Sequence, residues 1–414
     1  MNFKEYAVSR QTDIHLELER VRLLMELAGN PDRQLKIIHV AGTNGKGSVC
    51  AVVECGLNQM GCKTGKFSSP ELFDVTDTIT ANGKNITMPE LSAIYATLAP
   101  LCKEVEARTG KMPSQFEINF VASLVHFENT NCEYAVLECG MGGLGDATNA
   151  IGDSMLSIIT PVSTDHTSFL GDTPRQIAAN KCGIFKKSSK VITGFQTPDV
   201  MEVIAENAGS RELIEAKLPK STGFEGFNEI FDYGNLKNLK CSLCGIHQIK
   251  NAAIAIEALK VLGADEAIMR YAVANAKNPA RLEKLSEGVY FDGGHNPDGV
   301  RSLVESLNRY GLSGKIVFAV GMMADKDISG ALECLKQLNN QNFEIYTCPV
   351  HSNPRSASGE EIASVARQMG FEAKSFGSID DACRNADGKC DVLIIFGSLY
   401  MYKECDLCCE VNSL

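Results

Sequence analysis

Apolar positions along the chain alternate between short continuous runs and longer segments in which they recur at helical spacing. In residues 12–27 the helical spacing predicts an amphipathic helix that ends before Gly29 and Pro31. Residues 35–40 form a short, largely apolar run that predicts a buried strand. A glycine-rich loop follows this run, and a helix is expected from Ser48 to Met60 behind it.

Six further short apolar runs predict strands, and helical segments lie between them. The runs are residues 134–137, 156–159, 191–193, 317–320, 345–346 and 392–395. Alternation of this kind is typical of parallel sheets with helices on both faces, so the sequence predicts an α/β fold. No internal repeat and no low-complexity tract interrupts the pattern.

The chain has 414 residues, which is long enough for two domains. Residues 276–280 contain Pro279 and separate a helical stretch from a new strand, which makes them the best candidate hinge. We therefore expect an N-terminal domain over residues 1–276, a linker over residues 277–283 and a C-terminal domain over residues 284–414.

The composition of the chain indicates which kinds of binding partner and which cellular compartment to expect. Hydrophobic residues make up 44% and charged residues 22%, which is ordinary for a globular protein. The net charge of −11, from 40 Lys and Arg against 51 Asp and Glu, disfavours nucleic acid as the main partner. No apolar run approaches the length of a bilayer span, and residues 1–6 lack a signal-peptide pattern. We therefore expect no membrane partner and a cytoplasmic protein.

Sixteen cysteines are scattered through the chain. Cys241 with Cys244, and Cys405 with Cys408 and Cys409, contain enough thiolates for a zinc site. The two groups lie far apart along the chain and neither has the compact spacing of a zinc knuckle. Reduced thiols are therefore the favoured interpretation.

The loop after the first predicted strand carries the strongest chemical signal. It consists of Gly42, Thr43, Asn44, Gly45, Lys46, Gly47 and Ser48. Between a strand and a helix, glycine amides and the helix N-terminus can cradle a phosphate, with the lysine as counter-charge. The loop is shorter than the standard phosphate-binding pattern, which has a glycine where this chain has Val40.

Acidic residues and histidines follow other predicted strands. Glu138 follows residues 134–137, and Asp165 and His166 follow residues 156–159. The carboxyl ends of parallel strands meet at one edge of a sheet, where such side chains can hold Mg²⁺.

A third group of charged residues lies in and beyond the predicted hinge. Asp292 and His295 follow the apolar run at residues 289–291, and Arg281 lies on the hinge itself. Charges brought to a nucleotide from a second domain are typical of an enzyme that closes on its substrate.

In order and spacing, these motifs resemble the folylpolyglutamate synthase family, which in bacteria is often bifunctional with dihydrofolate synthase and belongs to the Mur ligase superfamily. The resemblance runs nearly end to end. Besides residues 42–48 it rests on residues 68–72, 138–149, 165–166, 181–184, 245–251, 280–283, 292–297, 325–327, 353–355 and 397–400. It implies an N-terminal P-loop-type parallel-sheet ATPase domain and a smaller Rossmann-like C-terminal glutamate-ligase domain.

The resemblance also implies roles for residues at the nucleotide. Lys46 and its loop would bind the ATP phosphates, and Arg281 would reach them as well. Asn251 would contact adenine, and Asp292 the ribose.

Further roles concern the metal and glutamate. Ser69, Glu138 and His166 would help to hold Mg²⁺. Lys181 matches a lysine that is carbamylated in the family, and its anionic carbamate would bind a second Mg²⁺. On its own, the sequence around Lys181 predicts a surface helix residue. His295 and Ser398 match positions near the incoming glutamate, where Arg355 would add charge.

The implied reaction is ATP-dependent ligation of L-glutamate to the γ-carboxylate of a folate through an acyl phosphate. Lys46, Lys181, His166 and Arg281 would carry the catalysis by positioning and by neutralising charge. Folate, L-glutamate and ATP are the expected partners, Mg²⁺ is the expected cofactor, and the protein is expected to be a monomer, as is common in the family.

Some positions depart from the family pattern near the folate site. Glu71 stands where the family has His, and Leu144 stands in a stretch that usually contains Arg. Dihydropteroate as a further acceptor is therefore left open, as is another Mur-superfamily amino-acid ligase with a different carboxylate acceptor. A third alternative is a nucleotide-binding regulator without turnover. A regulator would not need all five of the residues that are intact here, namely Lys46, Glu138, His166, Lys181 and Arg281.

Overall fold

The computed structural model describes residues 17–165 and 167–407. Contacts divide the chain into two compact units. Unit 1 comprises the chain up to Lys220, with Asp232–Leu239 and Lys250–Ala276, and unit 2 comprises Ser221–Phe231, Lys240–Ile249 and the chain from Lys277 onward. The domain boundaries expected from the sequence stay a prediction. Within the described ranges no helix is long and apolar enough to cross a membrane.

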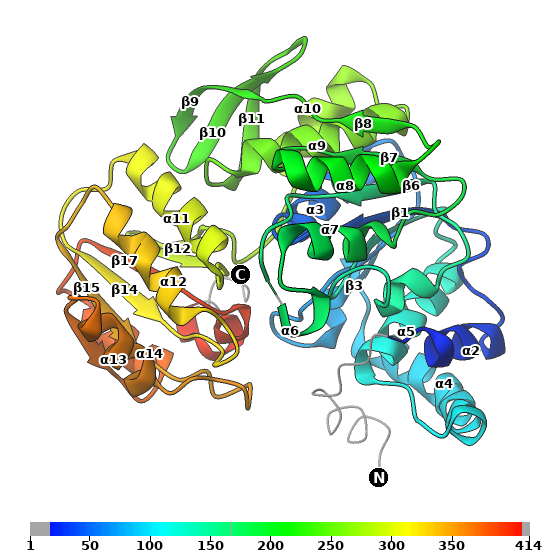
Figure 1. Ribbon diagram of the computed structural model, residues 1–414, viewed down its shortest axis with the longest axis horizontal. Helices are drawn as coiled ribbons and strands as arrows, with labels where there is room; N and C mark the ends of the chain where they lie inside the picture. The colour runs from blue at the N-terminus through cyan, green and yellow to red at the C-terminus, as the bar shows by residue number, and fades with distance from the viewer. Residues whose placement is uncertain (1–16, 166, 408–414) are drawn as a thin grey trace. The chain divides into compact units, whose positions relative to one another are not determined.

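An eight-stranded sheet in the order β4-β3-β2-β5-β1-β6-β7-β8 forms the centre of unit 1 (Figure 1). Its strands are β1 (Lys36–Ala41), β2 (Thr64–Phe67), β3 (Ile79–Ala81), β4 (Lys84–Asn85), β5 (Tyr134–Glu138), β6 (Leu156–Ile159), β7 (Lys190–Thr193) and β8 (Leu213–Glu215). β2, β5, β1, β6, β7 and β8 pair in parallel, and β3 and β4 add antiparallel pairs at one edge. The central strands are buried on both faces, which explains their nearly continuous apolar sequences.

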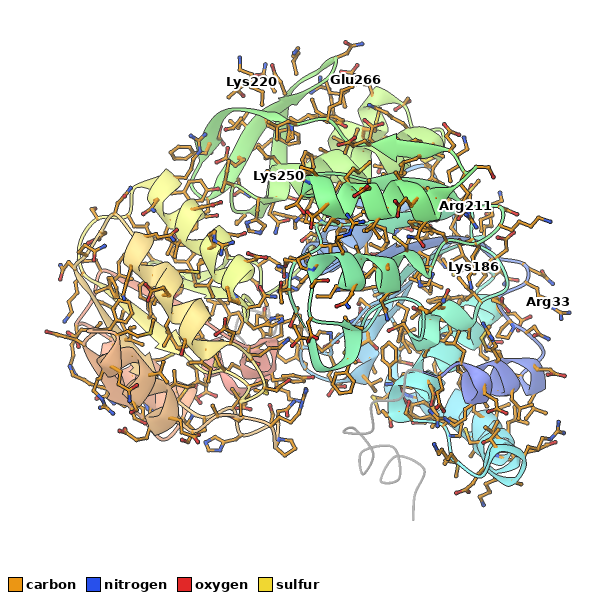
Figure 2. The ribbon with its side chains drawn as sticks, viewed as in Figure 1. Arg33, Lys186, Arg211, Lys220, Lys250 and Glu266 are labelled. Carbon is orange, nitrogen blue, oxygen red and sulfur yellow. The ribbon has the colours of Figure 1, made fainter. Side chains whose placement is uncertain are left out.

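Helices cover both faces of this sheet. They are α2 (Glu19–Leu27), α3 (Lys46–Gln59), α4 (Met88–Thr109), α5 (Gln115–Asn129), α6 (Thr167–Leu170), α7 (Pro174–Cys182), α8 (Pro198–Ala208), α9 (Gln248–Val261) and α10 (Glu266–Asn275). One core joins α2, α4 and α5 to the sheet around Phe67 and Leu137, and another joins α7 and α8 to it around Ile159. Charged side chains such as Arg33 and Glu266 are exposed at the surface of this unit (Figure 2).

Unit 2 contains a six-stranded sheet in the order β12-β13-β17-β14-β15-β16. Its strands are β12 (Glu283–Ser286), β13 (Val289–Asp292), β14 (Ile316–Val320), β15 (Phe343–Thr347), β16 (Ala373–Ser375) and β17 (Val392–Phe396), and only β12 pairs antiparallel. The longer helices are α11 (Pro297–Tyr310), α12 (Ile328–Glu333), α13 (Gly359–Gln368) and α14 (Ile379–Ala386). Phe318 and Phe396 lie in the core between sheet and helices.

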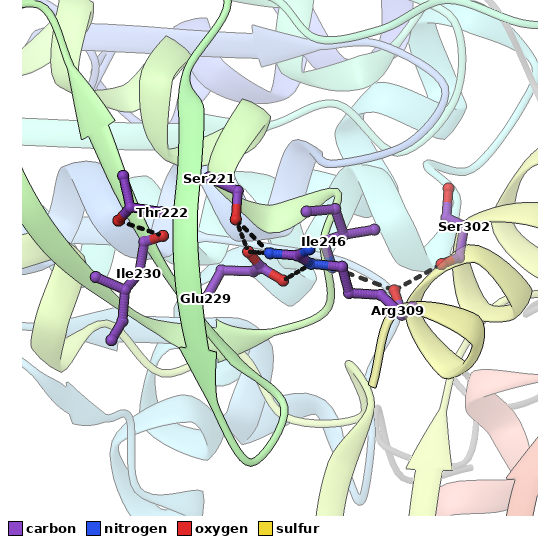
Figure 3. A network of polar contacts seen from close by, with 8 residues as sticks. Ser221, Thr222, Glu229, Ile230, Ile246, Ser302 and Arg309 are labelled. Atoms are coloured by element: carbon purple, nitrogen blue, oxygen red, sulfur yellow. Dashed lines mark hydrogen bonds and ion pairs between the residues drawn. The ribbon is translucent and has the colours of Figure 1, made fainter. Parts of the chain in front are cut away.

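A separate three-stranded sheet is made of β9 (Lys220–Glu225), β10 (Asn228–Tyr233) and β11 (Leu236–Cys244). Within unit 2, Arg309 of α11 binds the part of this sheet that belongs to the same unit (Figure 3). Its guanidinium donates to both carboxylate oxygens of the fully buried Glu229, at 2.9 and 3.3 Å, and to the Ser221 hydroxyl at 2.6 Å. The Phe227 ring stacks on Tyr310 with a centroid separation of 4.8 Å.

The α/β fold and every predicted strand are confirmed, with small differences at the ends. The helix expected from Ser48 begins earlier, at Lys46, because Gly45 takes a left-handed conformation and caps it. In the helix expected over residues 12–27, the described part is helical only from Glu19, and residues 12–16 lie outside the described residues. The three-stranded sheet was not predicted.

Candidate functional site

The glycine-rich loop joins β1 to α3 at the carboxyl edge of the unit 1 sheet. A Cβ atom on Gly42 would lie 1.8 Å from the Thr160 hydroxyl oxygen, and one on Gly45 would lie 2.3 Å from Oδ1 of Asn251. Both positions also have left-handed φ angles, of 149° and 90°. Glycine is therefore required at each of them, because any side chain would displace a neighbour.

The backbone amides of this loop are not all directed outward. The amides of Thr43 and Asn44 donate to the Pro161 carbonyl at 3.0 and 3.4 Å. The Thr43 hydroxyl donates to the Ser163 carbonyl and accepts from the Ser163 amide, both at 3.0 Å. The loop is thus bound along one side to the segment that follows β6.

Two lysine side chains converge on the Gly42 carbonyl. Lys46 donates to it at 3.3 Å and to the Thr43 carbonyl at 3.2 Å, and Lys181 of α7 donates to the Gly42 carbonyl at 2.8 Å. Lys181 is only 4% exposed. Burial, followed by the positive charge of Lys46, lowers the pKa of Lys181 from its ordinary 10.5 to about 7.

The surface position that the local sequence predicts for Lys181 is wrong. It lies on the buried face of α7 together with Ile177, Ala178 and Cys182. The polar end of the side chain reaches the phosphate-type loop rather than water. The neighbouring backbone is close as well, since a Cβ on Gly143 would lie 2.6 Å from the Lys181 carbonyl oxygen.

Glu138 is the last residue of β5 and is 5% exposed. It pairs in register with Val40 of β1, and Ser69 follows β2, which pairs with β5 on its other side. These predicted metal residues therefore lie at the same edge of the sheet as the glycine-rich loop. His166, which the resemblance also assigns to the metal, lies outside the described residues.

No group of three His, Cys, Asp or Glu side chains that could hold a metal ion occurs in the described part of the chain. The carboxylate of Glu138 and the hydroxyl of Ser69 are nevertheless oxygen donors of the kind that Mg²⁺ takes in small number alongside phosphate oxygens and water. The residues present therefore fit a magnesium ion that binds together with a nucleotide. They fit less well an ion whose ligands all come from the protein.

A buried polar network that the sequence did not predict supports the loop after Glu138. Asp146 accepts from the Met141 amide at 2.7 Å and from the amide and hydroxyl of Thr148 at 3.0 and 2.5 Å. The Thr148 hydroxyl also lies 2.8 Å from Nε2 of His39, which contacts Cys139 Sγ at 3.1 Å. Burial lowers the pKa of His39 to about 3, so this ring is neutral.

Asn251, the predicted adenine contact, lies on α9 and is 5% exposed. Its side-chain amide faces the backbone of Gly45 in the glycine-rich loop. The structure therefore brings Asn251, Lys46 and Lys181 together in unit 1.

In unit 2 the predicted residues lie at the carboxyl edge of the second sheet. Asp292 ends β13, is 6% exposed, and accepts from the amides of Leu282 and Gly294, both at 2.8 Å. Arg281 lies close by, because a Cβ on Gly293 would be 2.4 Å from its Nη1. β13 pairs in parallel with β17, which Ser398 follows at two residues' distance, so Ser398 lies at the same edge.

Two further predicted residues in unit 2 have local partners. His295 Nδ1 lies 2.9 Å from the Gly293 carbonyl oxygen. Arg355 pairs with Asp325 at 3.5 Å, and both side chains are partly exposed. The candidate zinc residues Cys241 and Cys244 are buried and half-buried free thiols, and Cys408 and Cys409 lie outside the described residues.

Comparison with known proteins places this arrangement in a class. The Mur ligase middle domain family matches residues 40–259, and the Mur ligase glutamate ligase domain family matches residues 280–399. The chain is therefore a Mur ligase in both of its parts. The dihydrofolate synthase/folylpolyglutamate synthase of Escherichia coli is 32% identical over 94% of this chain and 90% of its own. The folylpolyglutamate synthase of Lacticaseibacillus casei is 30% identical, with 92% of each chain covered.

Solved structures agree with the sequence matches. Folylpolyglutamate synthase of Mycobacterium tuberculosis complexed with ADP has a TM-score of 0.87 and 26% identity, covering 96% of this chain and 95% of its own. E. coli FolC in complex with DHPP and ADP has a TM-score of 0.85 and 27% identity, with 100% and 99% covered. The chain belongs to the folylpolyglutamate synthase and dihydrofolate synthase family of Mur ligases.

Proposed function

We propose that the protein ligates L-glutamate to the γ-carboxylate of a folate and converts ATP to ADP and phosphate. The observation that carries the proposal is the pair of amines, on Lys46 and Lys181, that meets at the Gly42 carbonyl beneath a glycine-rich loop. Lys46 would meet the negative charge of the nucleotide phosphates, and Lys181, once carbamylated, would hold the cation that accompanies them. The E. coli and M. tuberculosis relatives whose structures contain ADP support the same assignment.

The reaction needs activation because a free carboxylate is a poor acyl donor. An oxygen of the folate carboxylate attacks the γ-phosphorus of ATP, the bond to the β–γ bridging oxygen breaks, and ADP leaves. The glutamate nitrogen then attacks the carbonyl carbon of the acyl phosphate, loses a proton and expels inorganic phosphate. Lys46 would neutralise charge on the transferred phosphoryl group, and positioning would supply most of the remaining acceleration.

Ser69, Glu138 and His166 would hold Mg²⁺ together with the nucleotide. The ion supplies positive charge at the phosphates when it is bound. Within the chain, Glu138 is fixed for this task by the register of β5 against β1, and the Asp146 network fixes the loop that follows it.

Lys181 would act as a carbamate. With a pKa of about 7, a large share of its amine is neutral at neutral pH, and only a neutral amine reacts with carbon dioxide. The nitrogen then bonds to the carbon of CO₂ and loses a proton. The product is an anion beside Lys46, which removes the like-charge repulsion and provides oxygen ligands for a cation.

Unit 2 would supply the remaining contacts. Arg281 would reach the phosphates and Asp292 the ribose, and His295 and Ser398 would contact the incoming glutamate, whose two carboxylates need such donors. The boundaries at residues 277–283, the monomeric state and the cytoplasmic compartment belong to the same proposal.

ADP release tests the function directly. The assay contains L-glutamate and Mg·ATP, with either tetrahydrofolate or dihydropteroate as acceptor. Release with tetrahydrofolate alone indicates a polyglutamate synthase, and release with both indicates a bifunctional enzyme. If Mg·ATP binds but neither folate leads to ADP release, folate is overturned as the acceptor. The departures at Glu71 and Leu144 would then mark a changed acceptor site, and another carboxylate would be sought.

A further inference from the structure

We propose that Gln196, just after β7, is a positioning residue for this ligase: it fixes the segment 160–163 and, through that segment, the glycine-rich loop. The inference rests on the proposed function for its kinetic consequence. Its structural consequence does not depend on which acceptor the enzyme uses. Nothing in the motifs of the chain marks Gln196.

Both ends of the Gln196 side-chain amide bind the end of β6 or the segment after it, and the nitrogen also contacts Thr193 at the end of β7. The amide oxygen accepts from the Val162 backbone amide at 2.9 Å. The amide nitrogen donates to the Thr160 carbonyl and to the Thr193 hydroxyl, both at 3.0 Å, with the Ile159 carbonyl at 3.4 Å. One side chain thus spans the last residue of a strand and the segment beyond it.

The backbone before Gln196 is held in an uncommon conformation. Phe195 has a φ angle of 61°, which is costly for a bulky residue that is not glycine. This turn directs Gln196 back across the edge of the sheet toward β6. The hydroxyl of Thr193 completes the arrangement by donating to the Ile159 carbonyl at 2.9 Å.

The other side of the same segment binds the glycine-rich loop. Pro161 accepts from the amides of Thr43 and Asn44, and Ser163 exchanges two hydrogen bonds with the Thr43 hydroxyl. Residues 160–163 therefore lie between Gln196 and the loop that carries Lys46. If the segment loses its hold on one side, the loop loses a fixed support on the other.

Geometry specifies glutamine at this position. Both an acceptor and a donor are needed, for the Val162 amide and the Thr160 carbonyl. A glutamate has the same shape but presents an anionic oxygen to that carbonyl. A methionine fills the space and makes neither bond, and an unpaired buried amide or carbonyl is costly.

The test compares Gln196→Met and Gln196→Glu with Gln59→Met, a matched change at an exposed glutamine at the end of α3. Amide hydrogen exchange is read on the whole protein at Val162, Ser163, Thr43 and Asn44. Isothermal titration with Mg·ADP measures nucleotide affinity without turnover, and circular dichroism checks folding.

Both Gln196 variants are expected to lose exchange protection at residues 162–163 and 43–44 together, while the other strands of the sheet keep theirs. Mg·ADP binding should weaken, and kcat/KM for Mg·ATP should fall at least about tenfold, because small displacements of reacting groups are expensive. In the Gln196 variants, KM for L-glutamate should stay at its wild-type value. The Gln59→Met control should match the wild type in exchange protection, nucleotide affinity and kcat/KM.

Unchanged protection at Thr43 and Asn44 in a folded Gln196→Glu variant would overturn the proposal. So would a fall in thermal stability with unchanged nucleotide affinity, since that is the behaviour of a purely structural residue. If wild type binds Mg·ADP but ligates no folate, the proposed acceptor fails, while the exchange and titration results still decide the role of Gln196.

Discussion

The amines of Lys46 and Lys181 donate to one backbone carbonyl, that of Gly42, at 3.3 and 2.8 Å. They come from helices on different parts of the sequence, α3 and α7, and only the fold brings them together. Repulsion from Lys46 adds to burial in lowering the pKa of Lys181, and an anion at this site would relieve that repulsion. A bound nucleotide phosphate would supply such an anion, and carbamylation of Lys181 would itself turn one of the two groups into an anion.

Replacing Lys181 by alanine is expected to abolish turnover. Removing one buried electrostatic group from an active site commonly costs about 10²- to 10³-fold in kcat. The measurement is ADP release with saturating Mg·ATP, and Lys187→Ala, at an exposed lysine just beyond α7, serves as the matched control. Turnover near the wild-type rate in Lys181→Ala would remove Lys181 from the mechanism.

The buried amine of Lys181 should also make stability depend on pH. Between about pH 7 and 10.5 the amine is protonated in the unfolded chain and largely neutral in the folded one, so the unfolded state binds more protons. Wild-type stability from this group therefore rises with pH across that window. Lys181→Met should be the more stable protein at pH 7, and its advantage should shrink at pH 9, as measured by urea unfolding without added CO₂. A constant difference would show that the pKa is not lowered.

The Thr43 hydroxyl is expected to stabilise the fold through its hydrogen bonds with Ser163 rather than to bind a phosphate. It both donates to and accepts from Ser163, so Thr43→Ser should keep these bonds while Thr43→Val loses them. We expect Thr43→Val to lose about 1 kcal/mol of unfolding free energy, because the half-buried Ser163 amide loses its acceptor. Urea unfolding of the two variants measures this. Equal stability of Thr43→Ser and Thr43→Val would contradict it.

Asp146 is expected to stabilise the loop that follows Glu138. As a carboxylate it accepts from the Met141 and Thr148 amides, and an asparagine would turn an NH₂ group toward one of these donors. Asp146→Asn is expected to destabilise the protein by about 1–3 kcal/mol and to lower kcat. Asp172→Asn, at an exposed aspartate, is the control in the same unfolding and rate measurements. Full stability in Asp146→Asn would mean that the loop is held by other contacts.

Local sequence was sufficient for the elements that position the nucleotide. β1 is buried on both faces, and glycines at its end leave few alternatives to a strand, a tight loop and a helix. The depth of Lys181 could not be predicted, because its partner carbonyl is 139 residues away in the sequence. The role of Gln196 could not be predicted for the same reason, since its contacts with the segment after β6 join residues 34 to 37 positions apart in the sequence.

The three-stranded sheet escaped prediction for a different reason. β9 is exposed or half-exposed along its whole length, so it lacks the apolar run that marked the buried strands. Its stability depends on side chains from elsewhere in unit 2, among which Arg309 of α11 is the clearest.

Arg309 therefore offers a test of how that sheet is held. Glu229 is fully buried, and Arg309→Met would leave its carboxylate without a cation, which should cost about 3 kcal/mol of unfolding free energy or somewhat less, since Arg309 is partly exposed. The double variant Arg309→Met with Glu229→Gln removes the unpaired carboxylate charge and should recover part of the lost unfolding free energy. Urea unfolding followed by circular dichroism measures both, with Arg301→Met, an exposed arginine on the same helix, as control. If the double variant is as unstable as the sum of the single ones, the two side chains are not coupled, and the packing of Phe227 on Tyr310 must hold the sheet instead.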